Sequence, residues 1–184
     1  NQIAKADATI TVTPYSVTYD GQAHTAAGTA LGVRNEDLSA QLNLSGTTHT
    51  DAGSYNDTWS FAGGRNYNSP EHTLTNSIAK ADATITVAPY SVTYDGQAHT
   101  AAGTARGVRG DDLTSWLDLS GTTHTDAGSY NDTWSFAGGK NYNSPEHAVT
   151  NRIAKADATI RVEDYSGAYD AQPHGPAATI TGVQ

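Results

Sequence analysis

Short stretches in which apolar and polar residues alternate recur along the chain, separated by turn residues. Residues 8–12 and 15–19 both alternate with a period of two and are rich in β-branched or aromatic side chains, a pattern typical of half-buried strands. Pro14 lies between them and cannot donate to a sheet, so we expect the strand to be interrupted or to lie at an edge there. The pair Asp20-Gly21 predicts a turn directly afterwards, because glycine accepts a positive φ.

The whole pattern repeats. The segment Ile3–Ile10 returns unchanged at residues 78–85 and again at 153–160, which gives a period of 75 residues. The first two copies are identical at 63 of 75 positions, so they are tandem copies of one domain. The predicted division is residues 3–77 and 78–152 as two complete repeats, and residues 153–184 as a partial third repeat.

The clearest strand of each repeat carries its aromatic residues. In residues 55–61, the side chains of Tyr55, Trp59 and Phe61 fall on one face. Asp57 falls on the same face, and we expect it either to lie at the rim or to accept hydrogen bonds, because burying an unpaired carboxylate is costly. The predicted core anchors of the two copies are Trp59, Phe61, Trp134 and Phe136.

The remaining segments predict two more strands and one short helical turn. Residues 22–33 predict an extended, thinly packed strand, and residues 71–78 alternate again as a last strand. Asn35 is a candidate N-cap, followed by two acids and by leucines four residues apart, which predicts a helical turn over 36–42. The expected fold is all-β, with tandem Ig-like β-sandwich repeats joined end to end as a rod. The helical turn leaves β-grasp-like units as the alternative.

Composition narrows the function classes. The net charge of −9 argues against nucleic acid and against docking on an anionic membrane. No apolar run is long enough to span a bilayer, so we expect no membrane insertion within this segment. The chain has no cysteine, which together with tandem repeats suits bacterial surface proteins. Because the chain begins inside the repeat frame, we expect any export signal or anchor to lie outside it.

The ordered motifs Ala-Asp-Ala-Thr-Ile-Thr-Val, Tyr-Ser-Val-Thr-Tyr-Asp-Gly-Gln-Ala-His-Thr, Thr-His-Thr-Asp-Ala-Gly-Ser-Tyr and Asn-Tyr-Asn resemble the glycine-rich bacterial surface repeats called MBG or YDG-type domains. The resemblance covers both full repeats and the start of the third. It implies Ig-like modules arrayed in large secreted or wall-attached adhesin-like proteins, with no catalytic residues to transfer. The third copy departs from the pattern, since Ala171 replaces the turn glycine.

Candidate chemistry is sparse. No nucleophile elbow, phosphate loop, His-Glu-x-x-His motif or cysteine nucleophile is present, so we expect no enzyme and no cofactor. The histidines lack metal-ligand spacing, and polar strand and turn positions explain them more simply. Calcium is the stronger metal hypothesis and stays open, because surface repeats often stiffen their joints with it, although the acids are dispersed and no EF-hand-type loop is present. The acids that could hold calcium are Glu36, Asp37, Asp51, Asp57 and Glu71.

Two single positions carry weaker hypotheses. Lys5, Lys80 and Lys155 occupy one repeated position, where an isopeptide bond to Asn66 or Asn68 is conceivable but a solvated lysine is simpler. Trp116 replaces the Gln41 of the first copy, and an exposed tryptophan can stack on sugars or anchor a partner. It can equally pack on its own helical turn or on a neighbouring repeat.

The expected function is mechanical: stalk or spacer repeats of a large protein at the bacterial cell surface or outside the cell. The expected partners are neighbouring repeats of the same chain. Because residues 153–184 lack the aromatic strand, they cannot close a core alone. Either the repeat is truncated or another chain completes it by strand addition, which would give a homo-polymer. The alternatives are therefore a subunit of a self-assembling filament and a glycan- or protein-binding adhesive module.

Overall fold

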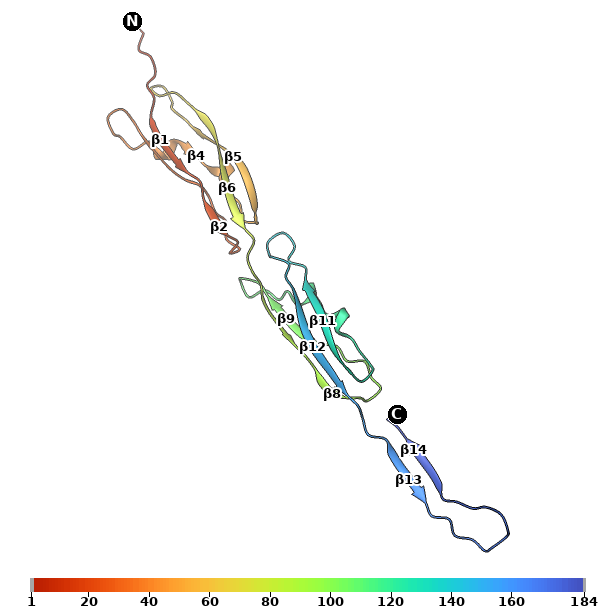
Figure 1. Ribbon diagram of the computed structural model, residues 1–184. Coiled ribbons are helices and arrows are strands. Elements are labelled where there is room, and N and C mark those ends of the chain that lie inside the picture. The colour runs from red at the N-terminus through yellow and green to blue at the C-terminus, as the bar shows by residue number, and fades with distance from the viewer. Residues whose placement is uncertain (1, 184) are drawn as a thin grey trace. The chain divides into compact units, whose positions relative to one another are not determined.

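A computed structural model describes residues 2–183, and the fold is all-β, as predicted (Figure 1). The first copy holds β1 (Thr9–Thr13), β2 (Ser16–Thr18), β3 (Ala27–Leu31), β4 (Leu42–Asn43), β5 (Gly53–Phe61) and β6 (Glu71–Ala79). The second holds β7 (Thr84–Ala88), β8 (Ser91–Thr93), β9 (Ala102–Arg106), β10 (Leu117–Asp118), β11 (Gly128–Phe136) and β12 (Glu146–Ala154). The third segment contains β13 (Thr159–Glu163) and β14 (Ala177–Thr181).

Each full copy has a two-stranded and a four-stranded sheet. In the first copy β1 pairs with β3, and the second sheet has the order β2-β6-β5-β4. The chain changes sheets at Pro14, since β1 pairs antiparallel with β3 whereas β2 runs parallel to β6. Proline cannot continue the ladder, so the predicted interruption is confirmed.

The core of the first copy lies between these two sheets. Ala30, Phe61 and Tyr67 form its buried centre, and Ile10 and Trp59 pack against it from β1 and β5. Phe61 is only 1% exposed, whereas Trp59 is partly buried. The buried centre thus combines one small, fully buried residue, Ala30, with two aromatic ones.

The predicted short helical turn within 36–42 is present but covers only three residues, and its predicted N-cap is wrong. Asn35 is not an N-cap but adopts a positive φ of 60°, and its N–H donates to the Gly32 carbonyl in a tight turn. Asparagine tolerates this left-handed conformation better than most residues. Only Ser39–Gln41 forms a single 3-10 turn, η1. Among residues 2–183 the helical elements are all three-residue 3-10 turns, so the helix of a β-grasp is missing there. The other turns are η2 (Ser45–Thr47), η3 (Thr114–Trp116) and η4 (Ser120–Thr122).

The predicted strand over residues 22–33 is shorter than expected. Only Ala27–Leu31 forms a strand, β3, while His24 makes an isolated bridge with His49. The bridge ties this segment to the loop before β5 instead of to β1. Residues 22–33 therefore take part in two different pairings, one of His24 with His49 and one of β3 with β1. The alternation of apolar and polar residues alone does not separate the two.

The third segment is an antiparallel hairpin whose side chains are exposed. Ile160 pairs with Ile180 in the register in which Ile10 pairs with Ala30. Ile180, which is 70% exposed, thus stands where the first copy has a fully buried alanine. Packing this hairpin on a sheet like that of the first copy would overfill the core. The hairpin is therefore not interchangeable with those of the first two copies.

The chain divides into two compact units. The first contains Asn1–Thr84, Ala105–Trp116 and Ala137–Pro145, and the second contains Ile85–Thr104, Leu117–Phe136 and Glu146–Gln184. Two loops of the second copy therefore belong to the same unit as the whole first copy. The repeat boundaries after residues 77 and 152 stay a prediction from the sequence. No helix within residues 2–183 is both long and apolar enough to cross a membrane.

Candidate docking ends of the repeat

A buried polar network lies behind the aromatic strand. Asp57 is 7% exposed and accepts hydrogen bonds from His49 Nε2 at 2.8 Å and from Asn76 Nδ2 at 2.7 Å. The Oδ1 of Asn76 accepts from the backbone N–H of Tyr15 at 3.0 Å, and His49 stacks on Tyr55 with ring centroids 3.6 Å apart. Of the two alternatives predicted for Asp57, a place at the rim or hydrogen bonds to its carboxylate, the second is confirmed.

The second copy reproduces the network. Asp132 accepts from His124 at 2.9 Å and from Asn151 at 2.8 Å. Burial of Asp132 alone would raise its pKa, but the hydrogen bonds from Asn151 and His124 outweigh burial, so the pKa lies below its usual value. In the described part of both copies no buried side-chain nitrogen or oxygen lacks a partner. The network thus fixes the strands that it joins.

The histidines and acids do not gather into a metal site. Within residues 2–183 no three His, Asp or Glu side chains converge. His24 and His49 pair through their backbones but bind separate carboxylates, those of Asp20 and Asp57. Glu36 accepts a short hydrogen bond from the Tyr67 hydroxyl. The acids considered for calcium therefore serve separate turns and networks.

The lysine considered for an isopeptide bond has another partner. Lys5 Nζ donates to the Gly64 carbonyl at 2.8 Å, and Lys80 Nζ donates to the Gly139 carbonyl at 2.6 Å. The lysine therefore contacts the backbone of the glycine turn that precedes the Asn-Tyr-Asn segment. This contact holds the start of the first and second copies against that turn.

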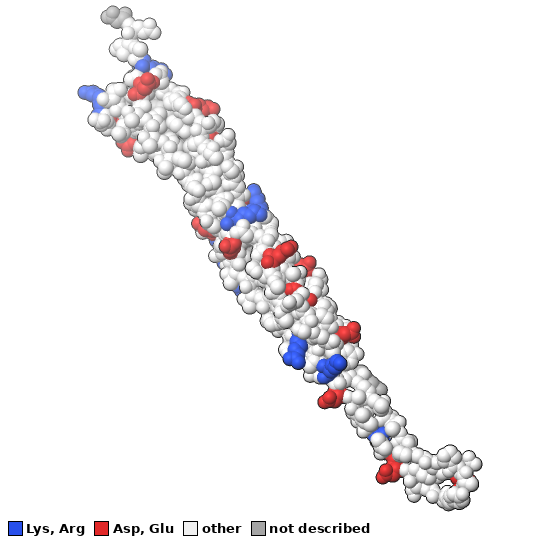
Figure 2. Space-filling view, viewed as in Figure 1, with Lys and Arg blue, Asp and Glu red and all other residues white. Residues whose placement is uncertain are grey.

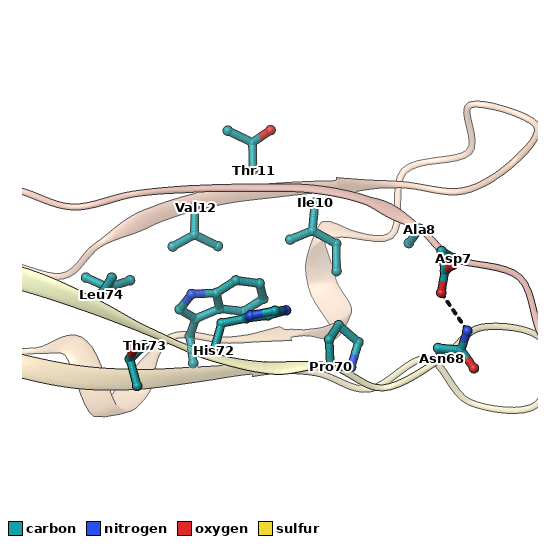
Figure 3. Close-up of a pocket in the computed structure, with 11 residues that line it drawn as sticks. Asp7, Ala8, Ile10, Thr11, Val12, Asn68, Pro70, His72, Thr73 and Leu74 are labelled. Atoms are coloured by element: carbon teal, nitrogen blue, oxygen red, sulfur yellow. Dashed lines mark hydrogen bonds between the residues drawn. The ribbon is translucent and has the colours of Figure 1, made fainter.

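An open groove of about 680 Å³ lies between β1 and β6 of the first copy (Figure 3). Ile10 and Val12 point into it from β1. Trp59 also lines it, with its ring 5.0 Å from that of His72. Among the lining residues only Asp7 carries a formal charge. This mixture of apolar walls and one carboxylate suits a neutral or cationic ligand better than an anion.

Trp116, the predicted binding residue, lies away from that groove. It is 42% exposed, and its indole lies over Gly139, where an added Cβ would come 3.6 Å from the ring. The tryptophan thus covers the glycine turn of its own copy. Of the other predicted anchors, Phe136 is as buried as Phe61, and Trp134 is partly buried with its ring 5.0 Å from His147.

The most specific polar contacts within the first unit join the first copy to the two loops of the second. Asp51 accepts from Lys140 Nζ at 3.0 Å and from Asn141 Nδ2 at 3.1 Å. The backbone N–H of Ala52 donates to Asn141 Oδ1 at 2.8 Å. Asn141 thereby donates with its amide nitrogen to Asp51 and accepts with its amide oxygen from Ala52. The two contacts fix the orientation of the amide as well as its distance from these two residues.

We call the contacts of Asp51 and Ala52 with Lys140 and Asn141 the joint. Two neighbouring contacts extend it. Arg109 Nη1 donates to the Gly21 carbonyl at 3.1 Å, and the Arg109 side chain lies so close that a Cβ on Gly21 would meet its Cδ at 2.4 Å. Tyr19 meets Tyr142 edge to face, with centroids 5.5 Å apart. We call Tyr19, Gly21, Asp51 and Ala52 the acceptor end, and Arg109, Lys140, Asn141 and Tyr142 the donor end.

The joint changes the titration of its charged groups. The hydrogen bonds from Asn141 and from Lys140 hold the pKa of Asp51 below its usual value, and Asp51 raises the pKa of Lys140. A carboxylate with a lowered pKa stabilises the folded form above its unfolded-state pKa, and that contribution is lost as the pH falls. The joint should therefore weaken in acid and not in mild alkali.

We expect the Asn141→Ala variant to raise the pKa of Asp51 towards its ordinary value, because Asn141 supplies the larger hydrogen-bond contribution. The side-chain carboxyl shift of Asp51, followed by NMR across an acid titration, measures this. Lys140→Arg, which the first copy carries naturally at residue 65, is the matched control and should leave the titration low. An Asp51 curve that does not move in Asn141→Ala would contradict the joint geometry.

Charge elsewhere is dispersed. On the face shown in Figure 2 most of the surface is uncharged, and basic and acidic side chains stand in small groups.

No protein-family model matches the chain, and no curated protein matches its sequence. The contacts of the chain itself therefore supply the argument for its function.

Proposed function

We propose that this chain consists of structural spacer repeats of a large bacterial cell-surface or extracellular adhesin-like protein. The observation that carries the proposal is the joint within the first unit, where Asp51 and Ala52 hold Lys140 and Asn141. A flexible tether between independent binding modules needs no such contact. A stalk needs one, because its reach depends on each repeat holding the next at a fixed angle.

The composition of the joint supports a mechanical role for the repeats more than a ligand-binding role. Both ends are built from residue types that each full copy carries, so the same joint can form at every step of an array. Repeat arrays gain stability in this way, from interfaces between neighbours added to the stability of each unit. The motif resemblance to bacterial surface repeats supports a position outside the cell for such an array.

The test is the spread of distances between the two copies. Spin labels on Thr11→Cys and Thr86→Cys, exposed equivalents on β1 and β7, report it by pulsed electron resonance. We expect a narrow distribution that broadens in Asp51→Ala, because the variant removes both side-chain contacts. Asp126→Ala, the same change in the second copy, is the control and should leave the distribution narrow. An equally broad distribution in the unmutated chain would rule out a stiff spacer.

A further inference from the structure

The groove of the first copy lies between two strands that each leave an edge unpaired (Figure 3). β1 pairs with β3 on one side, whereas β6 pairs with β5 on one side and with β2 on the other from Ser77 onwards. Among the described residues no strand pairs with the second edge of β1 or with the edge of β6 before Ser77. Both walls of the groove therefore include strand edges that are free to pair.

The backbone groups on the free edge of β1 alternate in direction. Ala30 of β3 donates its N–H to Ser39 Oγ at 3.1 Å and accepts the Leu38 N–H at 2.8 Å, so both of its backbone groups face away from β1. In an antiparallel ladder, two opposite residues either exchange both hydrogen bonds or both point outwards. Ile10 lies opposite Ala30 and therefore directs its N–H and C=O to the free edge. Val12, two residues further on, does the same.

The same reasoning applies to β6. The Ser77 N–H donates to the Tyr15 carbonyl at 3.0 Å, so Ser77 faces β2. The Pro70 carbonyl accepts the Phe61 N–H at 3.1 Å, so the even-numbered residues of this stretch face β5. Thr73, four residues before Ser77, therefore directs its N–H and C=O to the edge that β2 does not reach.

The second copy has the same free edges, although copies of the repeat lie on both sides of it in the sequence. β7 forms a two-stranded sheet with β9, and β8 pairs with β12 from Arg152 onwards. The Arg152 N–H donates to the Tyr90 carbonyl at 3.0 Å, as the Ser77 N–H does to Tyr15. The free edges are thus a property of the repeat and do not depend on its position along the chain.

We propose that the groove of the first copy binds one extended peptide segment of another protein, which adds as a strand to the free edge of β1 and has its second edge towards β6. Backbone groups that recur at every second residue match an extended peptide, because its own N–H and C=O groups have the same repeat. The segment runs antiparallel to β1, since antiparallel pairing is the more stable. This binding activity goes beyond the spacer function and does not use the joint.

The walls of the groove define which side chains the segment carries. The larger apolar side chains that line it are Ile10, Val12, Trp59 and Leu74. β-branched residues at alternate positions of the segment would cover this surface. Asp7, which is exposed, lies at the end of the groove where an antiparallel segment has its C-terminus, so a lysine fits there. The net charge of −9 also disfavours an acidic segment.

Amide hydrogen exchange of the chain alone tests whether the edge is free. The N–H groups of Ile10 and Val12 should exchange at least about tenfold faster than that of Thr11, which points towards β3. Equal protection of all three would mean that the β1 edge is already covered. Protection that grows with protein concentration would mean that a second copy of this chain pairs there. Either result would overturn the proposal.

A synthetic peptide tests the occupant. The probe is acetyl-Thr-Val-Thr-Val-Thr-Lys-amide, whose valines lie opposite Val12 and Ile10 when the lysine lies near Asp7. At millimolar concentration it should slow the exchange of both amides and shift the NMR resonance of the Thr73 N–H. N-methylation of the two valines should weaken binding at least about tenfold, because it removes the N–H groups that face β1. N-methylation of the first threonine, whose N–H points away from β1, is the matched control and should change binding less than about threefold.

A change in the protein tests the direction of the segment. Replacing the peptide lysine by glutamate should weaken binding about two- to fivefold, and Asp7→Asn should remove that difference. An unchanged difference in Asp7→Asn would overturn the antiparallel placement. Valine-methylated peptide that binds as well as the probe would mean contact without strand pairing and would overturn the proposal. The absence of binding at millimolar concentration would also overturn it, yet would leave the spacer function standing, since the joint lies elsewhere.

Discussion

Phe61→Ala should unfold the first copy at temperatures where the second copy remains folded. Phe61 is 1% exposed and lies at the centre of the core with Ala30 and Tyr67. Truncating a buried phenylalanine typically costs about 3–5 kcal/mol, from lost burial and from the cavity left behind. A domain of this size has only roughly 4–11 kcal/mol of stability. The variant therefore removes a large part of what holds the first copy together.

The near-identical second copy serves as an internal control, because both copies unfold in the same chain and in the same experiment. Chemical denaturation followed by circular dichroism should change from one transition to two, the earlier one belonging to the mutated copy. Thr73→Ala is the matched control, because the second copy carries alanine at the equivalent residue 148 and the side chain is exposed. That control should shift the first transition by less than about 0.5 kcal/mol, as surface changes usually do. A Phe61→Ala chain that unfolds like the control would mean that Phe61 is not central to the core.

The alternating pattern found the strands because burial in a sandwich has the same period of two as the strand itself. It also anticipated that Asp57, on the inward face of β5, needs hydrogen-bond donors. Between residues 35 and 42 it anticipated a short helical turn but extended it too far, because capping residues and leucines four apart imitate a longer helix. There the positive φ of Asn35 and the contact of Leu38 with the core decide the conformation, and both depend on the completed fold.

The joint was not predictable from local pattern, because it joins residues 89 and 90 positions apart. The sequence pattern offers Asp51 only as one of the dispersed acids that could hold calcium. One signal was present: the change from Arg65 to Lys140 keeps a positive charge beside an invariant asparagine. A charge kept between copies at an exposed position indicates a partner, but the fold was needed to show which carboxylate that partner is.

Asn151→Ala should destabilise the second copy strongly, because Asn151 is fully buried and connects three strands. Its Nδ2 donates to Asp132 on β11, and its Oδ1 accepts the Tyr90 N–H at 3.1 Å where the chain enters β8. The alanine leaves a carboxylate oxygen and a backbone N–H without these partners. An unsatisfied buried group costs about 1–3 kcal/mol, and more when it is charged, so we expect a loss of at least about 3 kcal/mol.

Asn151→Asp separates the loss of hydrogen bonds from charge repulsion. It places a second carboxyl against Asp132, and two adjacent buried carboxylates cannot both ionise easily, so one should hold a proton with a raised pKa. The folded form then binds more protons than the unfolded form, and stability should rise as the pH falls towards 4. In the chain without this change the second copy should behave oppositely, because the pKa of Asp132 lies below its usual value and its contribution disappears as the pH falls below the unfolded-state pKa of aspartate. Denaturation midpoints measured from pH 7 down to about pH 2 distinguish the two slopes, and parallel slopes would show that Asn151 does not control the Asp132 carboxylate.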